Sequence, residues 1–255
     1  MVDHSSGSGP DLILFHGGMG SWKHWIRNIE PLATRFTVHA FDHPAYGASA
    51  PVPRETTGAA YLDLVHDLFV EMFPGDSPLR LAGFSFGGAI AANLARRLSP
   101  RVTHLCLISP GGFPTRRFGD RPTRSYKEAE ADEKKFREVC RHNLLVNMLS
   151  DPASVSEETV DIQAENVRRT RFNSRKVSGG GTLLSDLAAL SSCRVRLIWG
   201  ERDDSPFRPA DLLIGEIRAA AVGALDLHRI PQAGHWSAYE NAPEVNRLML
   251  EFFSS

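Results

Sequence analysis

Residues 83–87 read Gly-Phe-Ser-Phe-Gly and set one serine, Ser85, among small neighbours. The segment follows the apolar run Leu79–Ala82 and precedes a run of small residues with helical character, Ala89–Leu98. A serine at a sharp strand-to-helix turn is lifted above the sheet edge, and glycines leave room for that turn. Ser85 is therefore our candidate nucleophile, and the N–H of Phe86, at the helix start, is free to bind negative charge.

A serine hydroxyl is a weak nucleophile until a base takes its proton. We predict that His235 is this base, because it follows the last predicted strand on a loop and comes directly after Gly234. Two adjacent carboxylates, Asp203 and Asp204, follow an earlier strand, and either could orient the imidazole. Neighbouring side chains point in different directions, so only one of the two can reach His235.

Acyl transfer also needs two backbone N–H donors where negative charge develops. Phe86 would supply one, and Gly18, in the loop His16-Gly-Gly-Met-Gly20, would supply the other. We expect Met19 in this loop and Phe84 beside the nucleophile to contact the substrate. Aromatic residues on both sides of the serine favour a hydrophobic acyl pocket.

Short apolar runs that could be strands alternate with helical patterns along most of the chain. This alternation predicts βαβ units and an α/β fold with a mostly parallel central sheet, covered by helices on both faces. Only about ten residues precede the first clear strand, so we expect about six strands, with any N-terminal strands missing or short. The predicted strands are Leu12–Phe15, Phe36–Phe41, Leu79–Ala82, His104–Ile108, Arg194–Trp199 and Leu225–Ile230.

Residues 113–182 interrupt this alternation with helical segments and no convincing buried strand. We therefore predict a helical cap inserted at 113–182 into a core formed by 1–112 and 183–255. The cap holds 14 of the 29 Lys and Arg residues. For any one of these arginines a solvated surface is the simpler interpretation, but a planar cation could also hold a carboxylate in the site. They include Arg116, Arg117, Arg121, Arg124, Arg168, Arg169, Arg171 and Arg175.

The composition is that of an ordinary globular protein. The chain has 255 residues and a net charge of −1, which argues against nucleic acid as a partner. Its three cysteines have no Cys-x-x-Cys spacing, so no zinc ribbon is predicted. No apolar run is long enough to span a membrane, and no secretion signal is recognisable. We expect a cytoplasmic protein with no cofactor and no metal; the oligomeric state is open.

The chain resembles the α/β-hydrolase fold superfamily over nearly its whole length. The loop from His16 matches the family's oxyanion motif, and residues 42–49 resemble its D-x-P-G-x-G-x-S turn, with Ala45 where glycine is usual. The family's order of serine, acid and histidine fits Ser85, then Trp199-Gly-Glu-Arg-Asp203, then His235. This resemblance favours Asp203 over Asp204 as the acid.

The C-terminal segment, residues 233–244, resembles the meta-cleavage-product hydrolases, which split C–C bonds in vinylogous diketo acids. In those enzymes a tryptophan follows the catalytic histidine, as Trp236 does here, and a cap arginine binds the substrate carboxylate. The resemblance therefore implies substrate contacts for Trp236 and for an arginine such as Arg168 or Arg169. The phenylalanines beside Ser85 depart from that subgroup, which usually has Asn before the serine and Met after it.

Three functions follow from these residues. The first is a serine hydrolase that cleaves a small carboxylic ester, with a carboxylate-bearing ester among the candidates, through an acyl-enzyme. The second is a C–C bond hydrolase of the meta-cleavage-product type. The third is a non-catalytic ligand-binding receptor on the same fold, and an intact set of catalytic residues argues against it.

Overall fold

The computed structural model describes residues 1–114, 122–204, 209–222 and 225–255. Its centre is one sheet of seven strands in the order β1-β3-β2-β4-β5-β6-β7. All neighbouring strands are parallel except β1 and β3, which are antiparallel. The strands are β1 (Val2–Ser6), β2 (Asp11–Phe15), β3 (Thr37–Asp42), β4 (Leu79–Phe84), β5 (Val102–Ile108), β6 (Arg194–Gly200) and β7 (Asp226–Ile230).

The sheet has one strand more than the six that the sequence predicts. Residues 2–6 read Val-Asp-His-Ser-Ser, which lacks the apolar pattern of a buried strand, yet they pair with β3 as an edge strand. Its backbone bonds to β3 are supported by side chains, because Asp3 accepts from His39 at 2.7 Å and Asp42 accepts from His4 at 3.3 Å. Polar residues are tolerated at a sheet edge, where one side faces water.

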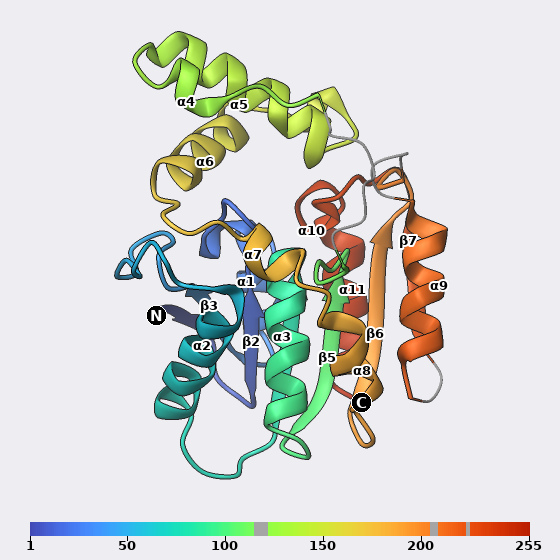
Figure 1. Ribbon diagram of the computed structural model, residues 1–255. Helices are drawn as coiled ribbons and strands as arrows, with labels where there is room; N and C mark the ends of the chain where they lie inside the picture. Colours follow the sequence, from blue (N-terminus) through green and yellow to red (C-terminus); the bar gives the residue numbers. More distant parts are fainter. Residues whose placement is uncertain (115–121, 205–208, 223–224) are drawn as a thin grey trace.

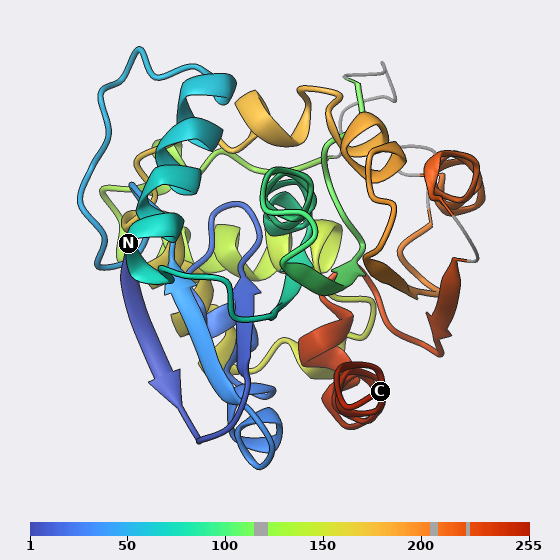
Figure 2. The ribbon, with the colours of Figure 1, turned by 90° about the horizontal axis from the view of Figure 1, so that it is seen from below.

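Helices cover both faces of the sheet, and alternate strand residues point into two separate cores. In Figure 2 one face carries α2, α3, α8 and α9 and the other carries α1 and α11. Leu81 and Leu107 point to the first face, whereas Ala82 and Cys106 point to the second. The helices are α1 (Ile29–Ala33), α2 (Gly58–Met72), α3 (Phe86–Arg97), α8 (Leu183–Ala188), α9 (Ala210–Ala220) and α11 (Ala242–Phe253).

A further layer of helices lies over the carboxyl ends of the parallel strands. Figure 1 shows α4, α5 and α6 there, set apart from the helices that flank the sheet. The short helix α7 also falls within the predicted cap segment, but it packs against α2 and α3 beside the sheet. No helix in the described part of the chain is long and apolar enough to cross a membrane. These helices are α4 (Tyr126–Ala129), α5 (Glu133–Asn147), α6 (Glu157–Arg168) and α7 (Arg175–Ser178).

Candidate active site

Ser85 occupies the sharp turn between β4 and α3 and has an unusual backbone conformation. Its φ is 52° and its ψ is −115°, a region that costs a non-glycine residue of order 1–3 kcal/mol. The turn needs glycine at its neighbours: a Cβ on Gly83 would lie 2.3 Å from the Gly87 carbonyl oxygen, and a Cβ on Gly87 2.2 Å from that of Phe15. The predicted strand-turn-helix context of Ser85 is therefore present.

Two hydrogen bonds join Ser85, His235 and Asp203 in a chain. His235 Nε2 lies 3.0 Å from Ser85 Oγ, and its Nδ1 lies 2.9 Å from Asp203 Oδ2. Asp203 is 4% exposed, so its carboxylate acts on the imidazole with little competition from water. Because a carboxylate only accepts, His235 carries its proton on Nδ1 and leaves Nε2 free to take the serine proton.

The two adjacent aspartates have separate partners. Asp203 reaches His235, whereas Asp204 Oδ1 accepts the N–H of Ala210 at 2.9 Å, at the first residue of α9. Asp204 therefore supports the start of a helix, where a negative charge is favourable. The structure places Asp203 beside the imidazole of His235, as the family motif implies. Asp204 lies at the start of α9 instead.

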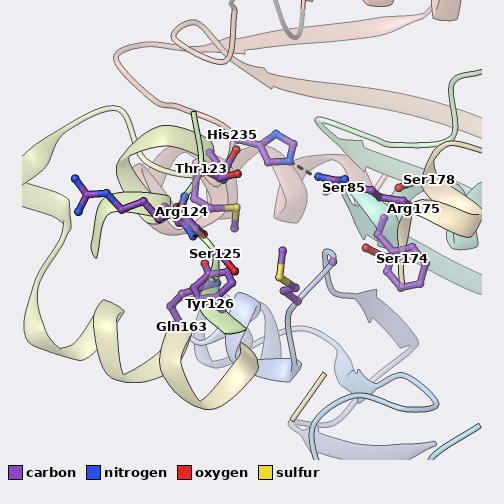
Figure 3. Close-up of a pocket in the computed structure, with 16 residues that line it drawn as sticks. Ser85, Thr123, Arg124, Ser125, Tyr126, Gln163, Ser174, Arg175, Ser178 and His235 are labelled. Atoms are coloured by element: carbon purple, nitrogen blue, oxygen red, sulfur yellow. Dashed lines mark hydrogen bonds between the residues drawn. The ribbon is translucent and has the colours of Figure 1, made fainter. Parts of the chain in front are cut away.

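A cavity of about 760 Å³ opens above Ser85 and His235 (Figure 3). Gly18, Met19 and Phe86 line it as well, so the predicted oxyanion residues face the same space as the nucleophile. Phe86 is the first residue of α3, and the first N–H groups of a helix have no partner within it. Two of the cap arginines named from the sequence, Arg124 and Arg175, also line it. The described lining further includes residues that the sequence did not indicate: Thr123, Ser125, Tyr126, Asn143, Asn147, Met148, Gln163, Ser174 and Ser178.

Two aromatic residues expected to contact substrate lie away from this cavity. Phe84 is 1% exposed, and its ring packs against the ring of His235 with the centroids 5.0 Å apart. Trp236 is fully buried, and its indole N–H donates to the carbonyl oxygen of His24 at 2.8 Å. Both belong to the core on the α1 and α11 side of the sheet. Neither residue lines the cavity as the sequence led us to expect, because both pack behind the catalytic side chains.

The predicted substrate-binding arginines, Arg168 and Arg169, also lie outside the cavity lining. Arg168 pairs with Glu133 and stacks over the Phe136 ring at 4.5 Å, and Arg169 pairs with Glu165 at 3.4 Å. Helix α6 ends at Arg168, so Arg171 lies beyond it, with its N–H bonded to Ala45. Arg168 and Arg169 thus form ion pairs at the surface of the helical layer and do not face the site. Arg116, Arg117 and Arg121 lie outside the described residues.

Arg175 is the arginine that faces the site. It lies at the start of α7, and Figure 3 shows its side chain extending toward the Ser85 and His235 pair. In the described part of the chain no carboxylate forms an ion pair with it. Arg124 also lines the cavity, but its side chain points away from Ser85 in Figure 3. An exposed guanidinium with no acidic partner beside a nucleophile can bind an anion.

The loop that carries His235 is fastened to the end of α5 by one carboxylate. Glu240 accepts the N–H of Gly234 through one oxygen at 2.6 Å, and through the other it accepts the N–H groups of Ser150 and Asp151 at 2.7 Å. The N–H of Trp236 donates to the carbonyl oxygen of Met148 at 2.7 Å. The position of His235 thus depends on the helical layer above it.

The model of one large family matches residues 12–248, most of the chain, and its description is the alpha/beta hydrolase family. The chain belongs to this family. The match confirms the predicted α/β-hydrolase fold and the prediction that the protein is a hydrolase.

Known relatives include several kinds of enzyme. The chain is 30% identical over 256 residues to the dihydrolipoyllysine-residue acetyltransferase component of an acetoin cleaving system from Cupriavidus necator; the match covers 95% of this chain and 63% of that protein. It is 26% identical to a 2-hydroxy-6-oxononadienedioate/2-hydroxy-6-oxononatrienedioate hydrolase from Pseudomonas sp, over 98% of this chain and 90% of the relative. It is 30% identical to a pimeloyl-(acyl-carrier protein) methyl ester esterase from Chromobacterium violaceum, over 96% and 94%.

Among solved structures, the fold is similar to that of a meta-cleavage product hydrolase from Pseudomonas fluorescens IP01, crystallised with acetates. The TM-score is 0.75 and the identity 23%, with 99% of this chain and 93% of the other covered. At this identity the likeness concerns the fold. The relatives include both an esterase and a 2-hydroxy-6-oxononadienedioate hydrolase, so the choice between these reactions depends on the site itself.

Proposed function

We propose that this protein is a serine hydrolase that cleaves a small carboxylic ester through an acyl-enzyme, with Ser85, His235 and Asp203 as its catalytic triad. The observation that carries the proposal is the hydrogen-bonded chain from Ser85 through His235 to Asp203, with Ser85 on the surface of a cavity. Helices α4 to α6 would form the cap over this cavity. The pimeloyl ester esterase among the relatives supports ester cleavage.

In the reaction that we propose, Ser85 Oγ attacks the ester carbonyl carbon while its proton moves to His235 Nε2. The carbonyl oxygen becomes an oxyanion, which the N–H groups of Phe86 and Gly18 stabilise. The C–O bond then breaks, and the alcohol leaves with the proton from His235. Water attacks the acyl-enzyme in the same way, with His235 as base, and releases the acid and Ser85. Asp203 holds the imidazole in the required tautomer throughout.

The direct test is chemical labelling and turnover. A fluorophosphonate should modify Ser85, and the protein should hydrolyse p-nitrophenyl esters of short acids. Modification of Ser85 without ester turnover would instead favour the second candidate or the receptor. If Ser85 is not modified and no ester is hydrolysed, the non-catalytic receptor is the better interpretation of the same cavity.

The second candidate is cleavage of a C–C bond in a vinylogous diketo acid. The Pseudomonas relative that hydrolyses such compounds favours it, as does a cation, Arg175, beside the nucleophile. The cap side of the cavity is polar, with Tyr126, Asn143 and Gln163 in its lining, which suits hydrogen-bonding substrates better than bare hydrocarbon ones. Turnover of a 2-hydroxy-6-oxo-dienoate at a higher kcat/KM than any ester would make this candidate the preferred one.

We assign the anionic end of the substrate to Arg175. Arg175→Gln should raise KM for an ester with a terminal carboxylate by about 10- to 100-fold, because a charge-assisted hydrogen bond contributes about 1.5–3 kcal/mol. A neutral ester of equal size should change by less than about twofold. The measurement is kcat and KM for both esters.

Arg124→Gln is the matched control for this experiment. It removes the same charge from the rim of the same cavity, but from a side chain that points away from Ser85. We expect it to treat the two esters alike. If Arg175→Gln also treats them alike, the assignment of Arg175 to a substrate anion is wrong.

A further inference from the structure

His24 touches all three loops that build the proposed site. It lies in the short 3-10 helix η1 (Trp22–Trp25) and is 1% exposed. Its ring packs at 4.9 Å from Trp236, next to the proposed base, and at 5.5 Å from Phe84, next to the nucleophile. Its Nδ1 accepts the N–H of Gly17 in the predicted oxyanion loop at 3.2 Å.

Gly17 is held between two imidazoles. On one side its N–H donates to His24, and on the other its carbonyl oxygen accepts from Nδ1 of His16 at 2.7 Å. The N–H belongs to the peptide before Gly17 and the carbonyl to the peptide after it. Both peptide planes are therefore fixed, and with them the backbone angles of a residue that would otherwise be very free.

This arrangement sets the direction of the Gly18 N–H. The Gly17 carbonyl and the Gly18 N–H lie in one trans peptide, so they point in opposite directions. The carbonyl is turned to His16, which is fully buried. The Gly18 N–H is therefore turned to the other side, and Gly18 lines the cavity above Ser85. Such prepositioned donors are the ones that stabilise an oxyanion without reorganisation.

The two imidazoles have to be neutral and in different tautomers. A carbonyl only accepts, so His16 carries its proton on Nδ1, and its Nε2 accepts the N–H of His43 at 3.2 Å. An N–H only donates, so His24 has a bare Nδ1 and carries its proton on Nε2. Burial supports both assignments, because it lowers the pKa of His16 to about 4 and the pKa of His24 well below its usual value.

We propose that His24 is a positioning residue for the oxyanion hole: by accepting the Gly17 N–H it fixes the loop that presents the Gly18 N–H to the substrate. The inference rests on the proposed function, since it concerns the same reaction. It adds to the proposed site a positioning residue, His24, that contacts neither the substrate nor Ser85. The backbone carbonyl oxygen of His24 also accepts the indole N–H of Trp236, which connects the His24 segment to the loop that carries His235.

Two substitutions separate the role of the acceptor from that of packing. His24→Leu keeps a branched side chain of similar reach but has no acceptor. His24→Asn places its amide oxygen at the position of Nδ1 and can still accept from Gly17. We expect His24→Leu to lower kcat for a p-nitrophenyl ester by about 100- to 1,000-fold with KM changed less than threefold, since loss of one oxyanion donor costs about that much. His24→Asn should stay within about fivefold of wild type.

A transition-state analogue gives a readout that packing alone would not move. A trifluoromethyl ketone forms a hemiketal with Ser85, and its oxyanion needs the same donors. His24→Leu should weaken its inhibition by the factor by which kcat falls, while inhibition by the product acid should barely change. Equal losses in the Leu and Asn variants, or unchanged kcat in a folded His24→Leu variant, would overturn the proposal.

A second variant covers the case in which His24→Leu does not fold. A Cβ on Gly20 would lie 2.5 Å from His24 Nδ1 and 2.7 Å from the Gly17 carbonyl oxygen, so Gly20→Ala should disturb the contact between His24 and Gly17 from both sides and lower kcat in the same way. Gly215→Ala is its control, because a Cβ there meets nothing within 4 Å. Full activity in Gly20→Ala would contradict the proposal. Activity that survives in Ser85→Ala would instead contradict the proposed function, so the two failures can be told apart.

Discussion

Ser85→Ala should fold as the wild type does and lose at least about three orders of magnitude in kcat, because no other group can form the acyl-enzyme. Alanine fits the turn at least as well as serine, since its side chain only lacks the hydroxyl that meets His235 Nε2. The melting temperature should therefore change little. The measurement is kcat for a p-nitrophenyl ester on purified protein, with circular dichroism to verify the fold.

Ser178→Ala is the matched control, because Ser178 lines the same cavity but is not bonded to the imidazole of His235 in the described structure. We expect it to keep its activity within about threefold. If Ser85→Ala keeps activity within tenfold of wild type, the assignment of the triad fails, whatever the other variants do.

Asp203→Asn should reduce kcat by about 10³- to 10⁴-fold with little loss of stability. An asparagine amide can donate to His235 Nδ1, which then carries no proton; the proton moves to Nε2, where the ring can no longer act as base toward Ser85. The same variant tests the geometry that sets Asp203 Oδ2 2.9 Å from Nδ1.

Asp204→Asn supplies the comparison within the same loop. Its side chain would still offer an oxygen to the N–H of Ala210, so kcat should remain within about threefold of wild type. A loss in Asp204→Asn together with normal activity in Asp203→Asn would mean that the acid is the other neighbour.

The turn around Ser85 and the alternation of strands and helices could be predicted because their causes are local. A strained turn demands glycine at fixed neighbours, and a buried parallel strand demands a short apolar run. The order of Ser85, Asp203 and His235 is implied by the resemblance to the α/β-hydrolase family, and the three can meet in space because parallel strands end at the same sheet edge. The edge strand β1 escaped prediction because its stability comes from pairing with β3 and not from its own apolar residues.

The predicted substrate-binding residues that do not line the cavity have partners that are distant in sequence. Nothing near Trp236 indicates that its indole N–H would bind the carbonyl of His24, 212 positions away. Arg168 and Arg175 have the same charge and lie only seven residues apart. Which one faces the cavity depends on where α6 ends and on an acidic partner, Glu133, from another helix. Such choices are made by tertiary packing, which the periodicity of a single segment does not report.

The carboxylate of Glu240 has a consequence for how the molecule opens. It accepts amides from Gly234 on one side and from Ser150 and Asp151 on the other. These three amide protons exchange with solvent when their hydrogen bonds to the Glu240 carboxylate break. The segment after α5 and the loop before His235 therefore open as one cooperative unit. A fluctuation that releases the end of α5 therefore also releases the backbone next to His235. The enzyme would be inactive in that open state. Ser150 and Glu240 are 90 positions apart in the sequence, so a contact between distant parts of the chain determines how long the site stays assembled.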